Sequence, residues 1–227
     1  KYFTDFDNEV SFTILATRPK YVKVGMDLTW DTWQDRSSFT KSASAEVGWR
    51  AEEAGAVDQN HVVSSDCDYI VPAGANLSTG GGSVENMTFE GHKLILQEGG
   101  KLVALRDGGA QTVTVGHLVA QGGELAGRRY DSQVKTFAGN FDLSEGDLGI
   151  SCDEGMKIAV TATVTGDYDI FLVGSNDNYA PYQLQFTGDM SDWTGTMKKP
   201  GDSRYNVSAY QLTVSGKFGG SFTSIPK

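Results

Sequence analysis

The sequence predicts an all-β fold in which short strands wind into a parallel β-solenoid behind an N-terminal cap. Three observations favour this fold. Phe89, Val113 and Phe137 follow one another at equal intervals, each within a short apolar segment. The turn pattern Gly-Gly-x-Leu occurs at residues 99–102 and again at 122–125, and the chain has 28 Gly but only 5 Pro. A fixed period of roughly 20 to 30 residues, built from short strands and glycine turns, is typical of stacked coils.

Residues 1–60 precede the periodic part and are predicted to form a cap of antiparallel strands. Apolar and polar residues alternate there with a period of two, which is typical of a half-buried strand. The expected inner face carries Phe12, Ile14, Val22, Val24, Met26, Leu28 and Trp30, and the expected outer face carries Tyr21, Lys23, Asp27 and Thr29. Strands at this end would also protect the first coil, since an uncovered solenoid end exposes a strand edge.

The second half of the cap has two open interpretations. Ala43, Val47 and Ala51 are spaced by four, which fits a short helix. Gly48 and Gly55 disfavour a helix, so an irregular loop is the alternative.

Residues 61–227 are predicted to form the solenoid domain, whose strands are too short to bury a face alone. Stacking one coil on the next would bury their apolar residues in a continuous column. The inward candidates are Leu94, Leu96, Leu102, Val113, Val115, Leu118, Leu125, Phe137, Phe141, Leu143, Ile158, Val160, Ala162, Val164, Ile170, Leu172, Leu184, Phe186, Leu212, Val214 and Phe218. An antiparallel β-sandwich is the alternative, because short strands at close, regular spacing suit that fold too.

Composition and charge exclude several functional classes. The net charge of −10 argues against nucleic acids and anionic membranes, which bind basic surfaces. No apolar window is long enough to span a membrane, and the first residues have no apolar signal region. We therefore expect a mature form or an excised domain of a larger multidomain protein. Cys67 and Cys152 fit either a disulfide or two buried thiols.

Several segments resemble the passenger repeats of bacterial autotransporter-like surface proteins. The matching runs are residues 68–74, 88–96 and 98–102, and the run 185–197 resembles the family's Gly-Asp-Asn-Ser repeat with Met190 at the Asn position and Trp193 at the aromatic position. The resemblance covers residues 60 to 220 approximately. It implies a right-handed parallel β-helix, export, and an extracellular or cell-surface setting. It implies no catalytic residues, because passenger modules are mostly stalks, adhesins or glycan-binding appendages.

Aromatic residues in polar segments are the candidate ligand-binding residues. A flat ring can stack on a sugar while nearby polar groups bind hydroxyls. The candidates are Trp33, Tyr179, Tyr182 and Trp193, with Arg128 for an anionic sugar. The alternative is that these rings pack loops or cover coil ends. The sequence thus favours a non-catalytic module that binds a glycan or another cell-surface ligand, or acts as a stalk.

The alternative function is a β-helical polysaccharide lyase or glycoside hydrolase with paired carboxylates. Asp142 and Asp167 are separated by nearly one period and come closest to stacking on adjacent coils. His92 and His117 have the same separation, and we expect a surface pair because two histidines do not close a metal site. No cofactor is predicted. The run 175–178 offers oxygen ligands for Ca²⁺ but lacks the glycine and terminal Glu of an EF-hand loop.

Overall fold

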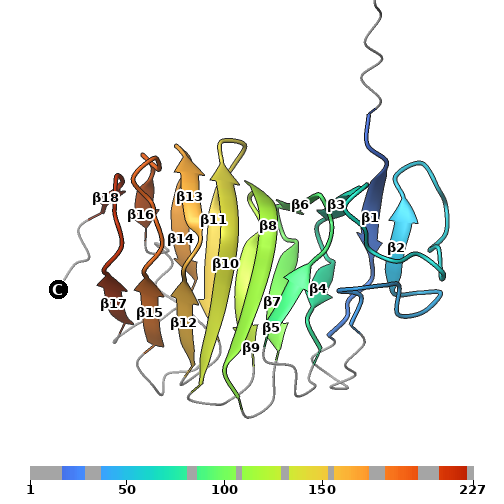
Figure 1. The fold of residues 1–227 in the computed structure, drawn as a ribbon, viewed down its shortest axis with the longest axis horizontal. Helices are drawn as coiled ribbons and strands as arrows, with labels where there is room; N and C mark the ends of the chain where they lie inside the picture. The colour runs from blue at the N-terminus through green and yellow to red at the C-terminus, as the bar shows by residue number, and fades with distance from the viewer. Residues whose placement is uncertain are drawn as a thin grey trace, which may run out of the picture.

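The chain folds into a parallel β-solenoid of about five turns in a computed structural model. The structure describes residues 17–28, 37–80, 86–105, 109–128, 133–152, 156–173, 182–198 and 210–223. No helix occurs in these ranges, and so none that is long and apolar enough to cross a membrane. Figure 1 shows the coils stacked side by side, from the N-terminal cap in blue to the last coil in red.

The strands are short, as the sequence predicts. They are β1 (Lys20–Val24), β2 (Gly48–Ala51), β3 (Asp68–Val71), β4 (Asn76–Ser78), β5 (Asn86–Phe89), β6 (Lys93–Gln97), β7 (Lys101–Leu105), β8 (Gln111–Gln121), β9 (Glu124–Arg128), β10 (Val134–Leu143), β11 (Leu148–Cys152), β12 (Lys157–Val160), β13 (Thr163–Gly166), β14 (Ile170–Val173), β15 (Tyr182–Phe186), β16 (Thr196–Lys198), β17 (Tyr210–Val214) and β18 (Ser221–Phe222).

Two sheets form the walls of the solenoid. One runs in the order β17-β15-β12-β10-β8-β6-β3-β1-β2, with β5 beside β8 and β13 beside β10, and the other in the order β18-β16-β14-β11-β9-β7-β4. Apart from β1 and β2, all paired strands of the described coils are parallel. The antiparallel sandwich is therefore wrong, because each strand pairs with its counterpart one coil away rather than with its neighbour in the chain.

The core lies between the two sheets and consists of stacked columns of apolar side chains. In one sheet, register places Leu94 beside Leu118, Phe141 and Val164 on successive coils. All the predicted inward residues from Leu94 to Phe186 are buried, while Leu212, Val214 and Phe218 on the last coil are only partly buried. Each stacked pair removes the apolar surface that one coil alone would expose to water, which stabilises the fold.

The predicted pairing is confirmed for Val113 with Phe137 and is shifted along β8 for Phe89. Val113 pairs with Phe137, as the equal spacing predicts, but Phe89 pairs with Val115 instead of Val113. The displacement has a local cause. Residues 90–92 separate β5 from β6, yet both strands pair with the single strand β8, so the segment that joins them bulges out of register with β8.

The cap continues the larger sheet. β1 pairs antiparallel with β2 on one side and parallel with β3 on the other. Aromatic rings close this end of the core: Tyr69 meets Trp49 edge-to-face at 4.8 Å and Phe89 at 5.3 Å between ring centroids. β1 and β2 are thus antiparallel, and the sheet continues from them across residue 60 into the coils.

The predicted inner face of the first strand is wrong within β1 and at Met26, although Leu28 is buried as predicted. Lys23 and Asp27 are buried, whereas Met26 is 37% exposed. The Lys23 Nζ lies 3.0 Å from the Asp27 Oδ1, and both side chains are fully buried. The face of β1 that carries Tyr21 and Lys23 therefore points inward, and Asp27 neutralises the buried ammonium of Lys23. Three members of the predicted face lie outside the described residues: Phe12, Ile14 and Trp30.

A short helix at residues 43–51 is also wrong. The Ser44 hydroxyl accepts hydrogen bonds from the main-chain nitrogens of Glu46 and Val47, at 3.3 and 3.1 Å. Serine side chains that bond nearby backbone in this way compete with helix formation. The turn leads directly into β2, where Trp49 is fully buried and its indole donates to the Ser38 carbonyl at 2.8 Å.

Candidate functional site

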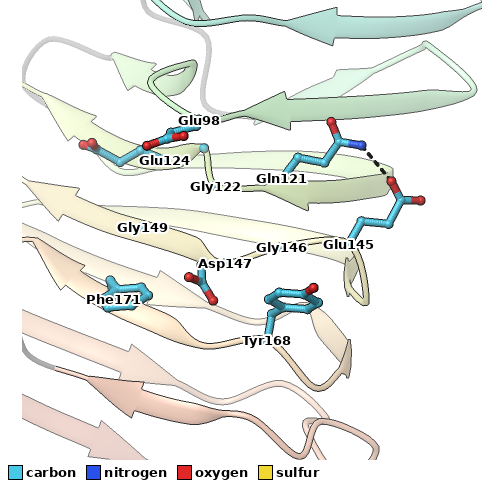
Figure 2. Close-up of a pocket in the computed structure, with 11 residues that line it drawn as sticks. Glu98, Gln121, Gly122, Glu124, Glu145, Gly146, Asp147, Gly149, Tyr168 and Phe171 are labelled. Atoms are coloured by element: carbon cyan, nitrogen blue, oxygen red, sulfur yellow. Dashed lines mark hydrogen bonds between the residues drawn. The ribbon is translucent and has the colours of Figure 1, made fainter.

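A groove of about 470 Å³ runs along one corner of the solenoid, where the strands of one sheet end and those of the other begin (Figure 2). It crosses the turns that follow β6, β8, β10 and β13, so four successive coils contribute to it. The lining residues are Glu98, Gln121, Gly122, Gly123, Glu124, Glu145, Gly146, Asp147, Gly149, Tyr168 and Phe171. Stacking of the coils therefore places four short turns side by side, and together these turns form one extended groove.

Glycines keep the floor of the groove open. Gly122 has φ of +90°, a conformation that other residues rarely adopt. A Cβ at Gly123 would lie 2.5 Å from the Leu96 Cβ, and one at Gly146 would lie 2.8 Å from the Gln121 Cα. These contacts are too close for any side chain, so the backbones of adjacent coils approach directly and leave the space above them free.

Aspartates fix the turns of adjacent coils to each other at this corner. The Asp147 Oδ1 accepts the main-chain nitrogen of Asp169 at 2.9 Å, and the Asp169 Oδ1 accepts that of Thr196 at 2.8 Å. Burial alone would raise the pKa of Asp169, but hydrogen bonds from Lys198 and Thr196 hold it below its usual value. Asp169 is therefore a structural carboxylate.

The acidic side chains of the groove differ in how fully they are engaged. Glu145 accepts a 2.7 Å hydrogen bond from Gln121 (Figure 2). Glu124 is held by Lys101 at 2.8 Å and by the Ser151 hydroxyl. Glu98 is exposed, and no described residue contacts its carboxylate through a hydrogen bond or ion pair. Glu98 is thus the acceptor most available to a ligand.

Two rings flank the acidic floor. Tyr168 is 45% exposed and Phe171 is half-buried. Figure 2 shows them on either side of the Asp147 carboxylate. Lys198 covers one side of Phe171, with its Nζ 5.7 Å from the ring centroid. Tyr168 therefore offers the larger free apolar face for stacking.

The structure describes the side chains of two of the five predicted ligand-binding residues, Arg128 and Trp193. Trp33 and Tyr179 lie outside the described residues, and so does the side chain of Tyr182 at the start of β15. Arg128 is buried at the end of β9, 3.8 Å from a Glu124 oxygen.

Trp193 has no exposed surface with which to contact a ligand. It is fully buried in the core, and its indole nitrogen donates to the Tyr168 carbonyl at 2.8 Å. No ring face is left for a sugar. Its role is to support the backbone of Tyr168, the exposed ring that the sequence did not single out.

The predicted carboxylate pair is wrong in its register. Asp142 pairs with Thr165, not with Asp167. The prediction assumed a longer coil, whereas β13 is reached earlier in the chain and stacks on β10 ahead of Asp167. The calcium candidate at 175–178 lies outside the described residues, and in the described ranges no three His, Cys, Asp or Glu side chains could hold a metal ion together.

The histidine pair is confirmed. The His92 and His117 rings meet edge-to-face with centroids 6.4 Å apart. Burial lowers the pKa of His117, as does the nearby Lys93 ammonium, while the Asp142 carboxylate opposes both. The disulfide alternative is wrong: Cys67 and Cys152 are both buried, and no disulfide joins them.

The acidic groove was missed because its residues are turn residues with no local ligand-binding signal. The signal that would have revealed it is recurrence. Glu98-Gly99, Gln121-Gly122 and Glu145-Gly146 repeat at coil intervals, so stacking brings acidic or amide side chains together.

Comparisons with known proteins add nothing to this assignment: no family model, no curated protein and no solved structure matches the chain.

Proposed function

We propose that this chain is a non-catalytic module of an exported or surface-displayed bacterial protein, and that its corner groove binds a neutral glycan. The observation that carries the proposal is one groove that has the exposed Tyr168 ring on its last coil and the available Glu98 carboxylate on its first (Figure 2). An aromatic face stacks on the apolar face of a sugar ring, and carboxylate oxygens accept hydrogen bonds from its hydroxyls. The groove spans several coils, which suits a chain of sugars rather than a single one.

The charge of the groove favours a ligand without acidic groups. Glu98, Glu145 and Asp147 line it, and the Lys101 ammonium is engaged by Glu124. Carboxylates repel acidic sugars, so neutral glycans are the ligands that fit the groove best. Arg128, the residue suggested for an anionic sugar, is buried at the other end of β9.

The surface setting rests on the autotransporter-like repeats together with the solenoid architecture. The run from Gly188 to Thr196 and the stacked coils support a role as an adhesin-like or stalk-like part of a larger protein. In this proposal the solenoid is the rigid scaffold and the groove is the recognition surface.

A glycan array with matched variants tests the proposal. We expect Tyr168→Ala to weaken binding about fivefold or more, since truncating an aromatic anchor typically costs more than about 1 kcal/mol. Phe222→Ala is the matched control, because this ring is 47% exposed but does not line the groove. Equal binding by wild type and Tyr168→Ala would contradict the groove as the site. Trp33→Ala, Tyr179→Ala and Tyr182→Ala test the other aromatic candidates on the same array.

The convergence of acidic side chains on the groove supports one alternative, polysaccharide cleavage. Glycoside hydrolysis uses two carboxyl groups, and Glu98 and Asp147 both line the groove. Release of reducing ends from a neutral polysaccharide by wild type, lost in Glu98→Gln, would replace the binding function with catalysis. Binding without any release on a broad panel of polysaccharides would reject the alternative.

A further inference from the structure

Two histidines from successive coils lie together on the outer face of the larger sheet. His92 directly precedes β6, and His117 lies within β8. The parallel register that joins Leu94 to Leu118 brings the two rings together. Their centroids are 6.4 Å apart and their planes are inclined at 77°.

Asp68 orients the first of these rings. The His92 Nδ1 lies 2.7 Å from the Asp68 Oδ1, on the coil before. When Nδ1 carries the proton of that hydrogen bond, the lone pair is on Nε2. A carboxylate bonded to the far nitrogen of a histidine is the usual support for a metal-binding imidazole, because it fixes the tautomer and increases the basicity of the ligand.

The remaining ring nitrogens are available. Within the described residues, none forms a hydrogen bond to the His92 Nε2 or to either ring nitrogen of His117. The His92 side chain is 39% exposed, and His117 is half-buried. Both imidazoles are therefore partly exposed to solvent, and each keeps at least one ring nitrogen without a hydrogen-bond partner among the described residues.

The charged groups around His117 act in both directions, and the Lys93 ammonium acts on it more strongly than either nearby carboxylate. The Asp68 and Asp142 carboxylates both act on His117 in the direction that favours positive charge. Apart from His92 itself, the Lys93 ammonium is the group that acts on His117 in the opposite direction, and it disfavours a bound cation. Removing it should strengthen cation binding at the pair.

We propose that His92 and His117 form an open site for a divalent transition-metal ion, with Asp68 as the residue that positions His92. Two imidazole nitrogens would be the protein ligands and water would fill the other positions, consistent with the lack of a three-ligand cluster in the described ranges. Imidazole ligands suit Cu²⁺, Ni²⁺ and Zn²⁺, and Cu²⁺ binds most tightly in this series. The site lies on the sheet face and not at the corner groove, so it stands independently of glycan binding.

Titration calorimetry with Ni²⁺ tests the proposal, since Ni²⁺ does not oxidise the two thiols. We expect one Ni²⁺ per chain, with binding abolished in both His92→Ala and His117→Ala. Asp68→Asn should weaken binding by about tenfold or more, the usual effect of removing a supporting carboxylate. Lys93→Gln should strengthen it. Circular dichroism confirms that each variant is folded.

The chain has three histidines, and the third provides the control. His61 is buried and bonded to the Tyr69 hydroxyl at 2.9 Å, so His61→Gln should leave Ni²⁺ binding unchanged. Electron paramagnetic resonance with Cu²⁺ should show splitting from two nitrogens in wild type, and this two-nitrogen splitting should be absent in either single variant. Wild-type affinity in His92→Ala or in His117→Ala, or a one-nitrogen spectrum in wild type, would overturn the proposal.

Discussion

The indole nitrogen of Trp193 donates a 2.8 Å hydrogen bond to the main-chain carbonyl of Tyr168, one coil earlier. The two aromatic residues thus have opposite roles. Trp193 is fully buried in the core, whereas Tyr168 is 45% exposed at the edge of the groove. Gly195 makes the contact possible, because a Cβ there would lie 2.0 Å from the same carbonyl oxygen. The interior of one coil therefore determines where the surface ring of the previous coil stands.

Trp193→Phe should destabilise the protein by about 1–3 kcal/mol, because the part-buried Tyr168 carbonyl loses its indole donor. Urea denaturation followed by circular dichroism measures the change. Tyr168→Phe is the control, since it keeps the carbonyl and removes only an exposed hydroxyl, and it should change stability by no more than about 0.5 kcal/mol. If both variants were equally stable, the indole hydrogen bond would have no structural role.

The buried ion pair of the cap predicts unequal effects for its two partners. Asp27 also accepts hydrogen bonds from the main-chain nitrogens of Ser38 and Ser78, both at 2.9 Å. Asp27→Ala should therefore cost about 3–5 kcal/mol, the range for removing one member of a buried pair. Lys23→Met should cost less, because Asp27 keeps its other donors. Urea denaturation of the two variants compares them directly, and equal losses would contradict this account.

Gly139 should not tolerate a side chain. It has φ of +117°, and a Cβ would lie 1.8 Å from the Val115 carbonyl oxygen at the bulge between β8 and β10. Gly139→Ala should cost about 2–4 kcal/mol from strain and steric overlap. Gly116 lies on the neighbouring strand, and a Cβ there would have no heavy atom within 4 Å, so Gly116→Ala is the matched control. Thermal unfolding should separate the two variants clearly, and similar midpoints would refute the prediction.

His61 should make the stability of the cap sensitive to pH. Its ring stacks on Tyr21 at 3.7 Å and contacts the Tyr69 hydroxyl. Burial lowers the pKa of His61 below its ordinary value of 6.5, although the Asp58 carboxylate opposes the change. The unfolded chain therefore takes up a proton at higher pH than the folded chain does. The free energy of unfolding should fall as pH decreases below about 6.5 and level off below the folded-state pKa.

The measurement is the urea midpoint at about pH 7.5 and about pH 5.5. The difference between the two values should be smaller in His61→Gln than in wild type, because glutamine has no proton to take up. An unchanged difference would show that His61 does not contribute to acid sensitivity.

The buried interior of the coils could be predicted because it depends on a local pattern, the alternation of apolar and polar residues along each strand. Leu94, Leu118 and Phe141 lie inward on successive coils, and all three are buried. A short strand has only two faces, so alternation identifies the inner one once the period is known. The coil period also predicted that His92 and His117 would be neighbours on successive coils.

Features that depend on coil length or on distant partners could not be predicted. Asp142 and Asp167 are separated by a plausible interval, but the actual offset at that coil is shorter. Lys23 is buried against its partner Asp27, and alternation cannot reveal such a partner. The groove depends on turns from four coils, so Tyr168 and Glu98 have no recognisable relationship in the sequence.

The hydrogen bonds between coils run along the length of the molecule, since each strand pairs with the strand one coil away. Tension applied between the two ends would load these bonds lengthwise, and coils would detach singly from an end while the others stayed intact. Each detached coil, such as the one from Val113 to Phe137, would release roughly 80 Å of extended chain. Under tension the protein would therefore lengthen in discrete steps, one coil at a time, instead of unfolding in a single event.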